Sequence, residues 1–212
     1  MRKTTLLSIY LSTCISITTS YADTFTISGT HIQQNGVNKT WRGANAMHVF
    51  GGKSDDMNRW NMDIVREFVG DVKNVPITGG AVNVNGKWFH PLSTIIANNR
   101  LNGKVTIITP FGWDGVVFSG KNPSQQPFYN AYKAKMREWA TYIKNQPDVW
   151  IEVWNEPYHW QNLNYPLDHS LWLADMKDMV DNIRSTGCTN IIVVPGTYKA
   201  KVRTQFWQKD KN

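Results

Sequence analysis

The residues best placed to do chemistry are Asn155 and Glu156, which follow an apolar run and precede Pro157. Residues 149–154 are rich in Val, Ile and Trp, as in a strand that is covered on both faces. Pro157 has no backbone donor and ends this strand. Glu156 therefore lies at the carboxyl end of a strand, where parallel α/β folds place their active sites. Beside the two tryptophans of the run it is a candidate general acid, because an apolar setting favours the protonated form of a carboxyl group.

The elements around this strand alternate between strands and helices, which predicts a parallel sheet with right-handed crossovers. Apolar residues at helical spacing predict helices, and short β-branched runs predict strands. Asn35-Gly36 predicts the turn of an N-terminal hairpin. The expected strands are 41–46, 72–77, 105–109, 149–154 and 191–194, and the expected helices lie within 57–68, 91–96, 128–143 and 172–183.

With these surroundings, the Asn155-Glu156-Pro157 segment resembles the family 5 glycoside hydrolases, which are cellulases and mannanases with a (β/α)8 barrel fold. In that family an Asn-Glu-Pro motif closes the fourth strand. The resemblance implies that Glu156 is the acid/base of a retaining mechanism on a β-1,4-linked polysaccharide. The motif alone occurs often by chance, and the strand before it and the aromatic residues after it give it specificity. The alternative is that Glu156 is an ordinary loop carboxylate.

The expected fold class is therefore α/β, a (β/α)8 barrel of the TIM type, with about five of the eight βα units in residues 23–212. A complete barrel typically needs about 250 residues. In the family the nucleophile is a second Glu at the end of the seventh strand, which this chain does not reach. Two alternatives to an active hydrolase therefore stay open, an inactive truncated remnant and a noncatalytic carbohydrate-binding protein.

Two other carboxylates lie near the motif in sequence or in the expected fold. Retaining enzymes need two carboxyl groups about 5–5.5 Å apart and inverting enzymes about 6.5–9.5 Å. Glu152 is about 13 Å from Glu156 along an extended strand, so we expect it to be a buried structural group. Asp114 follows the third strand and would be the partner in an inverting pair, although Asp before Gly is more often a turn residue.

The family pattern is incomplete at two further points. Many members carry an Arg at the end of the second strand, and residues 74–79, expected to end it here, contain none. Many carry a His after the third strand, where this chain has Pro110 and Phe111. The substrate-binding pattern is therefore expected to be atypical.

Several aromatic and polar residues follow expected strands and belong to the same face as Glu156. Trp113 and Trp160 are candidate platforms for sugar rings, because the C–H face of a sugar packs on an aromatic ring; the alternative is packing under a loop. His48 is either a ligand of a sugar hydroxyl or a surface loop residue. Asn155 and Tyr158 complete the predicted substrate-binding set.

Residues 1–22 have the features of a secretory signal peptide. Arg2 and Lys3 precede an apolar core at 6–17, and Ser20-Tyr21-Ala22 is a cleavage signal. This predicts a secreted protein, extracellular or periplasmic, with no membrane anchor after cleavage. Cys188 is the only cysteine left after cleavage, so no internal disulfide is expected, and we expect a buried, inert thiol.

Other classes of function lack their signatures. The formal net charge is +7, but the basic residues are scattered and no nucleic-acid-binding module is present. No Cys/His cluster predicts a metal, and no Gly-x-Gly-x-x-Gly or Gly-x-Ser-x-Gly motif predicts a dinucleotide cofactor or a serine hydrolase. We therefore expect no cofactor and a polysaccharide or oligosaccharide as the only partner, while the oligomeric state stays open.

Overall fold

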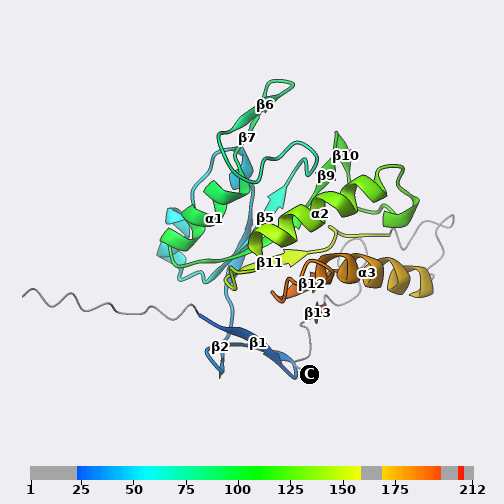
Figure 1. The fold of residues 1–212 in the computed structure, drawn as a ribbon. Coiled ribbons are helices and arrows are strands. Elements are labelled where there is room, and N and C mark those ends of the chain that lie inside the picture. Colours follow the sequence, from blue (N-terminus) through cyan, green and yellow to red (C-terminus); the bar gives the residue numbers. More distant parts are fainter. Residues whose placement is uncertain (1–22, 159–168, 197–204, 208–212) are drawn as a thin grey trace, which may run out of the picture.

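The computed structural model describes residues 23–158, 169–196 and 205–207. Its centre is a six-stranded sheet in the order β13-β12-β11-β8-β5-β4, in which β13 alone is antiparallel. Three α-helices pack on one face of the sheet, and an N-terminal hairpin lies at the opposite end from the β6–β7 hairpin (Figure 1). The strands of the sheet are β4 (Gly43–Ala46), β5 (Ile64–Val69), β8 (Val105–Pro110), β11 (Val149–Glu152), β12 (Ile192–Val194) and β13 (Gln205–Trp207), and the helices are α1 (Leu92–Leu101), α2 (Tyr129–Ile143) and α3 (His169–Arg184).

The five parallel strands succeed one another in chain order across the sheet, as in a (β/α)8 barrel, and this confirms the predicted fold class. Side chains alternate between the two faces of each strand. Val149 and Ile151 of β11 enter the large core beneath the helices, while Trp150 enters a smaller cluster on the other face. Glu152 follows Trp150 by two residues and therefore shares its face.

The predicted second strand was wrong. Residues 64–69 form β5 rather than the end of a helix, because Ile-Val-Arg-Glu-Phe-Val alternates with period two: Val65, Glu67 and Val69 are buried and the residues between them are half-buried. Residues 72–77, expected to be that strand, form a turn and an irregular segment. The second strand therefore contains an arginine, Arg66. The inference that this strand lacks an Arg was drawn from residues 74–79, which do not belong to it.

Three short hairpins share one kind of turn. Asn35-Gly36 joins β2 (His31–Gln34) to β3 (Val37–Asn38), as predicted, while β1 (Phe25–Ser28) pairs with β2. Asn85-Gly86 joins β6 (Val82–Val84) to β7 (Lys87–Phe89), and Asp114-Gly115 joins β9 (Gly112–Trp113) to β10 (Val116–Val117). All six turn residues have positive φ, which suits the right-handed twist of two-residue hairpins. The last two hairpins were not predicted.

The remaining helix predictions were confirmed. In α2, Tyr132, Met136 and Trp139 are buried at helical spacing, and the corresponding residues of α3 enter the same core. Two 3-10 helices, η1 (His48–Phe50) and η2 (Asp55–Trp60), lie between β4 and β5, and η3 (Pro123–Gln125) precedes α2. Cys188 is buried, and burial raises the pKa of its thiol. No helix within the described ranges is long and apolar enough to cross a bilayer.

Candidate active site

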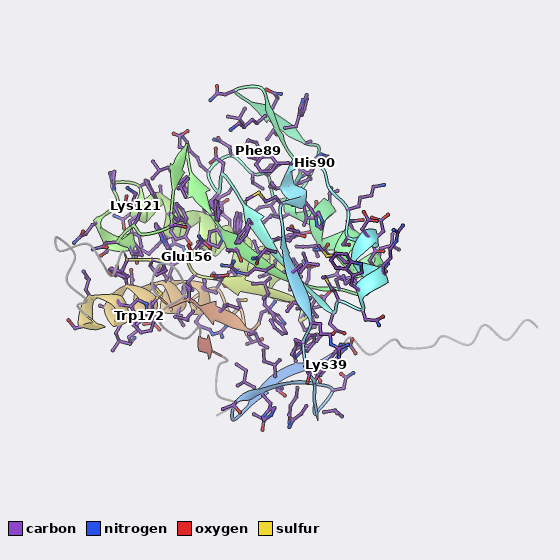
Figure 2. All side chains as sticks on the ribbon, turned by 180° about the vertical axis from the view of Figure 1, so that it is seen from behind. Lys39, Phe89, His90, Lys121, Glu156 and Trp172 are labelled. Atoms are coloured by element: carbon purple, nitrogen blue, oxygen red, sulfur yellow. The ribbon has the colours of Figure 1, made fainter. Side chains whose placement is uncertain are left out.

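Glu156 lies four residues beyond the end of β11, on the carboxyl-end side of the sheet (Figure 2). Its φ of 43° is in the left-handed region, which is uncommon for residues other than Gly. The Gly120 amide donates to its carbonyl over 2.7 Å and thereby holds the turn. The carboxylate is half-buried and has no hydrogen-bond partner among the described residues. A held backbone with an uncommitted carboxylate is the arrangement expected of a group that meets a ligand.

Asn155 is fixed from two sides. It is 2% exposed, its amide donates to Ser119 Oγ over 2.8 Å, and its Oδ1 accepts from Arg66 Nη2 over 3.0 Å. These contacts assign the amide oxygen to the side of the guanidinium and the amide nitrogen to the loop after β10. The side chain is therefore preorganised rather than free to rotate.

Arg66 and Glu152 form a bidentate ion pair between β5 and β11. Arg66 Nε and Nη2 donate to the two carboxylate oxygens, each over 2.7 Å, and Thr109 Oγ1 donates to Glu152 over 2.8 Å. Glu152 is 1% exposed, and a carboxylate so deep needs this many donors to offset its lost hydration. The expectation that Glu152 is a buried structural group was therefore confirmed, and through Arg66 it also holds Asn155.

Aromatic rings support the turn that carries Glu156. Trp154 stacks on Phe118 with ring centroids 3.9 Å apart, and its indole nitrogen donates to the Phe118 carbonyl over 3.2 Å. Trp150 lies elsewhere, in the small cluster with Phe25 and Trp41 toward the amino ends of the strands. Only one of the two tryptophans before the motif therefore borders the turn.

His48 is neither a surface residue nor aimed at solvent, since it is only 8% exposed. Its Nδ1 donates to Glu67 Oε1 over 2.6 Å, and Asn99 of α1 donates to the same oxygen over 2.9 Å. Glu67 belongs to the helix-facing side of β5. The surface-loop alternative for His48 was therefore wrong, and its role toward sugar stays a prediction.

The pH dependence of stability provides a test of the His48–Glu67 pair. The hydrogen bond with Glu67 raises the pKa of the His48 imidazole, against the opposing effect of burial, with Asn99 and Asp55 adding to the rise. A histidine whose pKa is higher in the folded state than in the unfolded state stabilises the protein. This stabilisation is fully present below the unfolded-state pKa of about 6.5, and it is lost as the pH rises through the folded-state pKa.

We expect His48→Gln to lose about 2 kcal/mol of unfolding free energy near pH 6, the size of a charge-assisted hydrogen bond, and less near pH 9. Urea unfolding at the two pH values measures this difference. His31→Gln, an exposed histidine of β2, is the matched control. An equal loss for His48→Gln at both pH values would contradict the charged pair.

The other predicted site residues are placed as follows. Trp113 is half-buried, with one face stacked on Phe128 at 5.7 Å. The Tyr158 hydroxyl bonds to Asp175 of α3 beneath the loop. Trp160 lies outside the described residues. The platform roles of Trp113 and Trp160 and the substrate-binding role of Tyr158 stay predictions.

Asp114 is a turn residue. It has a φ of 49°, is exposed in the β9–β10 turn, and pairs with Lys73. Its position fits the turn-forming alternative raised from the sequence.

Three residues that sequence reasoning missed hold the site together: Arg66, Thr109 and Ser119. Arg66 was hidden by the helical interpretation of its segment. Period-two alternation in residues 64–69 was the available signal for it. Thr109 and Ser119 contribute single hydroxyls, and nothing in their local sequence distinguishes them. Among the described residues, no cluster of His, Cys, Asp or Glu could hold a metal ion.

The sheet order, the helices on one face and the position of the turn at the carboxyl end of β11 define the (β/α)8 class of barrels, of which the described residues contain five parallel strands and three α-helices. Solved structures share this fold. They include the catalytic domain of a mannanase from Streptomyces sp. SirexAA-E (TM-score 0.59, 15% identity, 94% of this chain and 57% of that chain). An endocellulase from Pyrococcus horikoshii gives a TM-score of 0.64 at 12% identity over 84% of this chain and 58% of that chain. The chain thus spans less than three fifths of either.

The sequence also matches a family model. Residues 25–212 match the model of the cellulases, glycosyl hydrolase family 5, and the chain belongs to that family. A search of curated protein sequences gave no match.

Proposed function

We propose that this chain belongs to an exported glycoside hydrolase that cleaves β-1,4-linked polysaccharide by a retaining mechanism. The observation that carries the proposal is the uncommitted carboxylate of Glu156, next to an Asn155 that Arg66 and Ser119 hold in place. Family membership supports hydrolysis of O-glycosidic bonds. The signal-peptide features of residues 1–22 support export.

In this proposal Glu156 protonates the leaving-group oxygen and later takes a proton from the attacking water. Asn155, with its orientation fixed, binds a sugar hydroxyl beside the scissile bond. The second carboxylate is the nucleophile, which the family resemblance assigns to the end of the seventh strand. Within the described ranges no hydrogen bond or ion pair joins Glu156 to another carboxylate, and Glu152 is occupied by Arg66 and Thr109.

The glycan is proposed to be a β-1,4-linked glucan or mannan. The structural relatives include a mannanase and an endocellulase in complex with cellotetraose. The described residues do not favour one of the two sugars, so both enter the test.

The stereochemistry of the product tests the mechanism. We expect release of the β-anomer first from cello- and manno-oligosaccharides, followed by NMR before mutarotation, because two displacements at the anomeric carbon retain configuration. First appearance of the α-anomer would contradict the retaining mechanism. Binding of oligosaccharide without any product would favour the second candidate, a noncatalytic carbohydrate-binding protein.

A further inference from the structure

Asp175 is a buried carboxylate on α3 that lies outside the polar group around Glu156 and Asn155. It is 4% exposed, and among the described residues no ion pair involves it. A carboxylate that loses its water needs hydrogen-bond donors from the protein. Its Oδ2 accepts from the Tyr158 hydroxyl and, over 3.2 Å, from the Ser124 amide of η3. Asp175 therefore joins α3 to two loops, the one that follows β11 and the one that precedes α2.

The same two loops are hydrogen-bonded to each other around Glu156. The Gly120 amide donates to the Glu156 carbonyl over 2.7 Å, and the Tyr158 amide donates to the Lys121 carbonyl over 3.0 Å. Tyr158 thus holds the neighbouring loop with its backbone and α3 with its side chain. Figure 2 shows α3, on which Trp172 is labelled, beneath the turn that carries Glu156.

The turn needs these contacts because its backbone conformation is unfavourable. Glu156 and Tyr158 have φ values of 43° and 57°, in the left-handed region that is uncommon for residues other than Gly. Glu156 also precedes Pro157, and a residue before proline prefers an extended backbone. Such a conformation persists only where the surrounding structure holds it. Because the backbone conformation sets the direction of a side chain, the contacts that hold the turn also aim the Glu156 carboxylate.

We propose that Asp175 is a positioning residue, which acts through the Tyr158 hydroxyl to hold Glu156 in the orientation that proton transfer requires. Asp175 is buried beneath the loop and acts without touching the substrate. The inference assigns α3 a part in the reaction, although no residue of this helix reaches the scissile bond. It rests on the proposed function, since it takes Glu156 to be the general acid.

Steady-state kinetics test the proposal. Asp175→Ala should lower kcat about tenfold and change KM less than about twofold, because a small displacement of a catalytic group slows the chemical step. Tyr158→Phe should lower kcat further, since the Leu171 carbonyl of α3, 3.3 Å from the hydroxyl, is a second acceptor that only this variant leaves unused. Asp175→Asn keeps an oxygen that can accept from both donors, and we expect it to retain kcat within about threefold.

Hydrogen exchange of the Gly120 amide gives a second readout that needs no substrate. This amide is bonded to the Glu156 carbonyl, so opening of the turn exposes it to water. We expect its exchange, followed by NMR, to be about tenfold faster in Asp175→Ala and Tyr158→Phe than in the unsubstituted protein. Asp175→Asn should exchange at nearly the unsubstituted rate.

Tyr129→Phe is the matched control. Tyr129 is 8% exposed and donates to Asp178 of α3 over 2.8 Å, but it belongs to α2 and not to the turn. This variant loses a similar hydrogen bond, and we expect it to leave kcat and Gly120 exchange unchanged.

Three results would overturn the proposal: unchanged kcat and exchange in Tyr158→Phe, an equal loss of kcat in Tyr129→Phe, or a rise in KM at constant kcat, which would make Tyr158 a substrate-binding residue. If the unsubstituted chain releases no product, the proposed function fails. Gly120 exchange then decides by itself whether Asp175 holds the turn. Product release with unchanged exchange in Asp175→Ala and Tyr158→Phe would sink the positioning role alone.

Discussion

Glu156→Gln is expected to lower kcat for polysaccharide hydrolysis by about 10²- to 10⁴-fold, with a small change in KM. Gln has the shape of Glu but cannot transfer a proton to the leaving-group oxygen. The surrounding contacts should survive, because the Glu156 side chain makes no hydrogen bond within the described residues and the turn is held by its backbone carbonyl. Reducing-sugar release under saturating substrate measures the effect.

Asp114→Asn is the control for this result. Asp114 is an exposed turn residue, and Asn supports the same left-handed backbone conformation. We expect its hydrolysis rate to stay within about twofold of the unsubstituted protein, since losing an exposed ion pair costs little. A large loss in Asp114→Asn with an active Glu156→Gln would reverse the assignment of the acid. Equal large losses in both would favour the inverting pair.

Glu152→Gln is expected to lower the free energy of unfolding by about 2–3 kcal/mol. Removing one partner of a buried ion pair leaves the other charge without compensation, which typically costs about 3–5 kcal/mol. The cost is reduced here because the Arg66 side chain is 26% exposed and water screens it. Urea unfolding followed by tryptophan fluorescence measures the change.

Lys177→Ala provides the comparison for Glu152→Gln. Its ion pair with Asp181 spans one helical turn, with both side chains more than half exposed. Such a pair contributes about 0.5 kcal/mol or less. If Glu152→Gln unfolds at the same urea concentration as Lys177→Ala, then Glu152 does not bear the structural role described above.

The same substitution should also act on the site. The glutamine of Glu152→Gln has no negative charge and only one oxygen to accept from the guanidinium. Arg66 is then no longer held by two hydrogen bonds in the position from which it contacts Asn155. Substrate binding is therefore expected to weaken together with stability. Thr109 donates to the same carboxylate and would keep part of the arrangement, so the loss is expected to be smaller than that of Glu156→Gln.

Local patterns determined most of the fold. The buried Val-Ile-Trp run followed by Asn155, Glu156 and Pro157 placed the candidate acid at a strand end, since burial on both faces leaves a continuous apolar sequence. The amphipathic spacing in α2 and α3 determined both helices for a similar reason. Asn35-Gly36 determined its turn through the φ values that few other residues adopt.

Where two periodicities competed, local reasoning failed. Residues 57–68 contain apolar side chains at both helical and strand spacing, and the pairing of β5 with β4 and β8 decided between them. Backbone hydrogen bonds to two neighbouring strands outweigh a weak helical pattern in a segment that lies between them. The position of Arg66 on the second strand followed from that pairing alone.

The family, the later strands and helices and the placement of Glu156 at a strand end could be predicted, because each depends on residues close together in the chain. The groups that surround Glu156 depend on tertiary packing. Arg66 and Glu152 are 86 residues apart and meet because β5 and β11 flank β8. His48 likewise gained a buried partner in Glu67, since packing of η1 against β5 joins residues that share no local pattern.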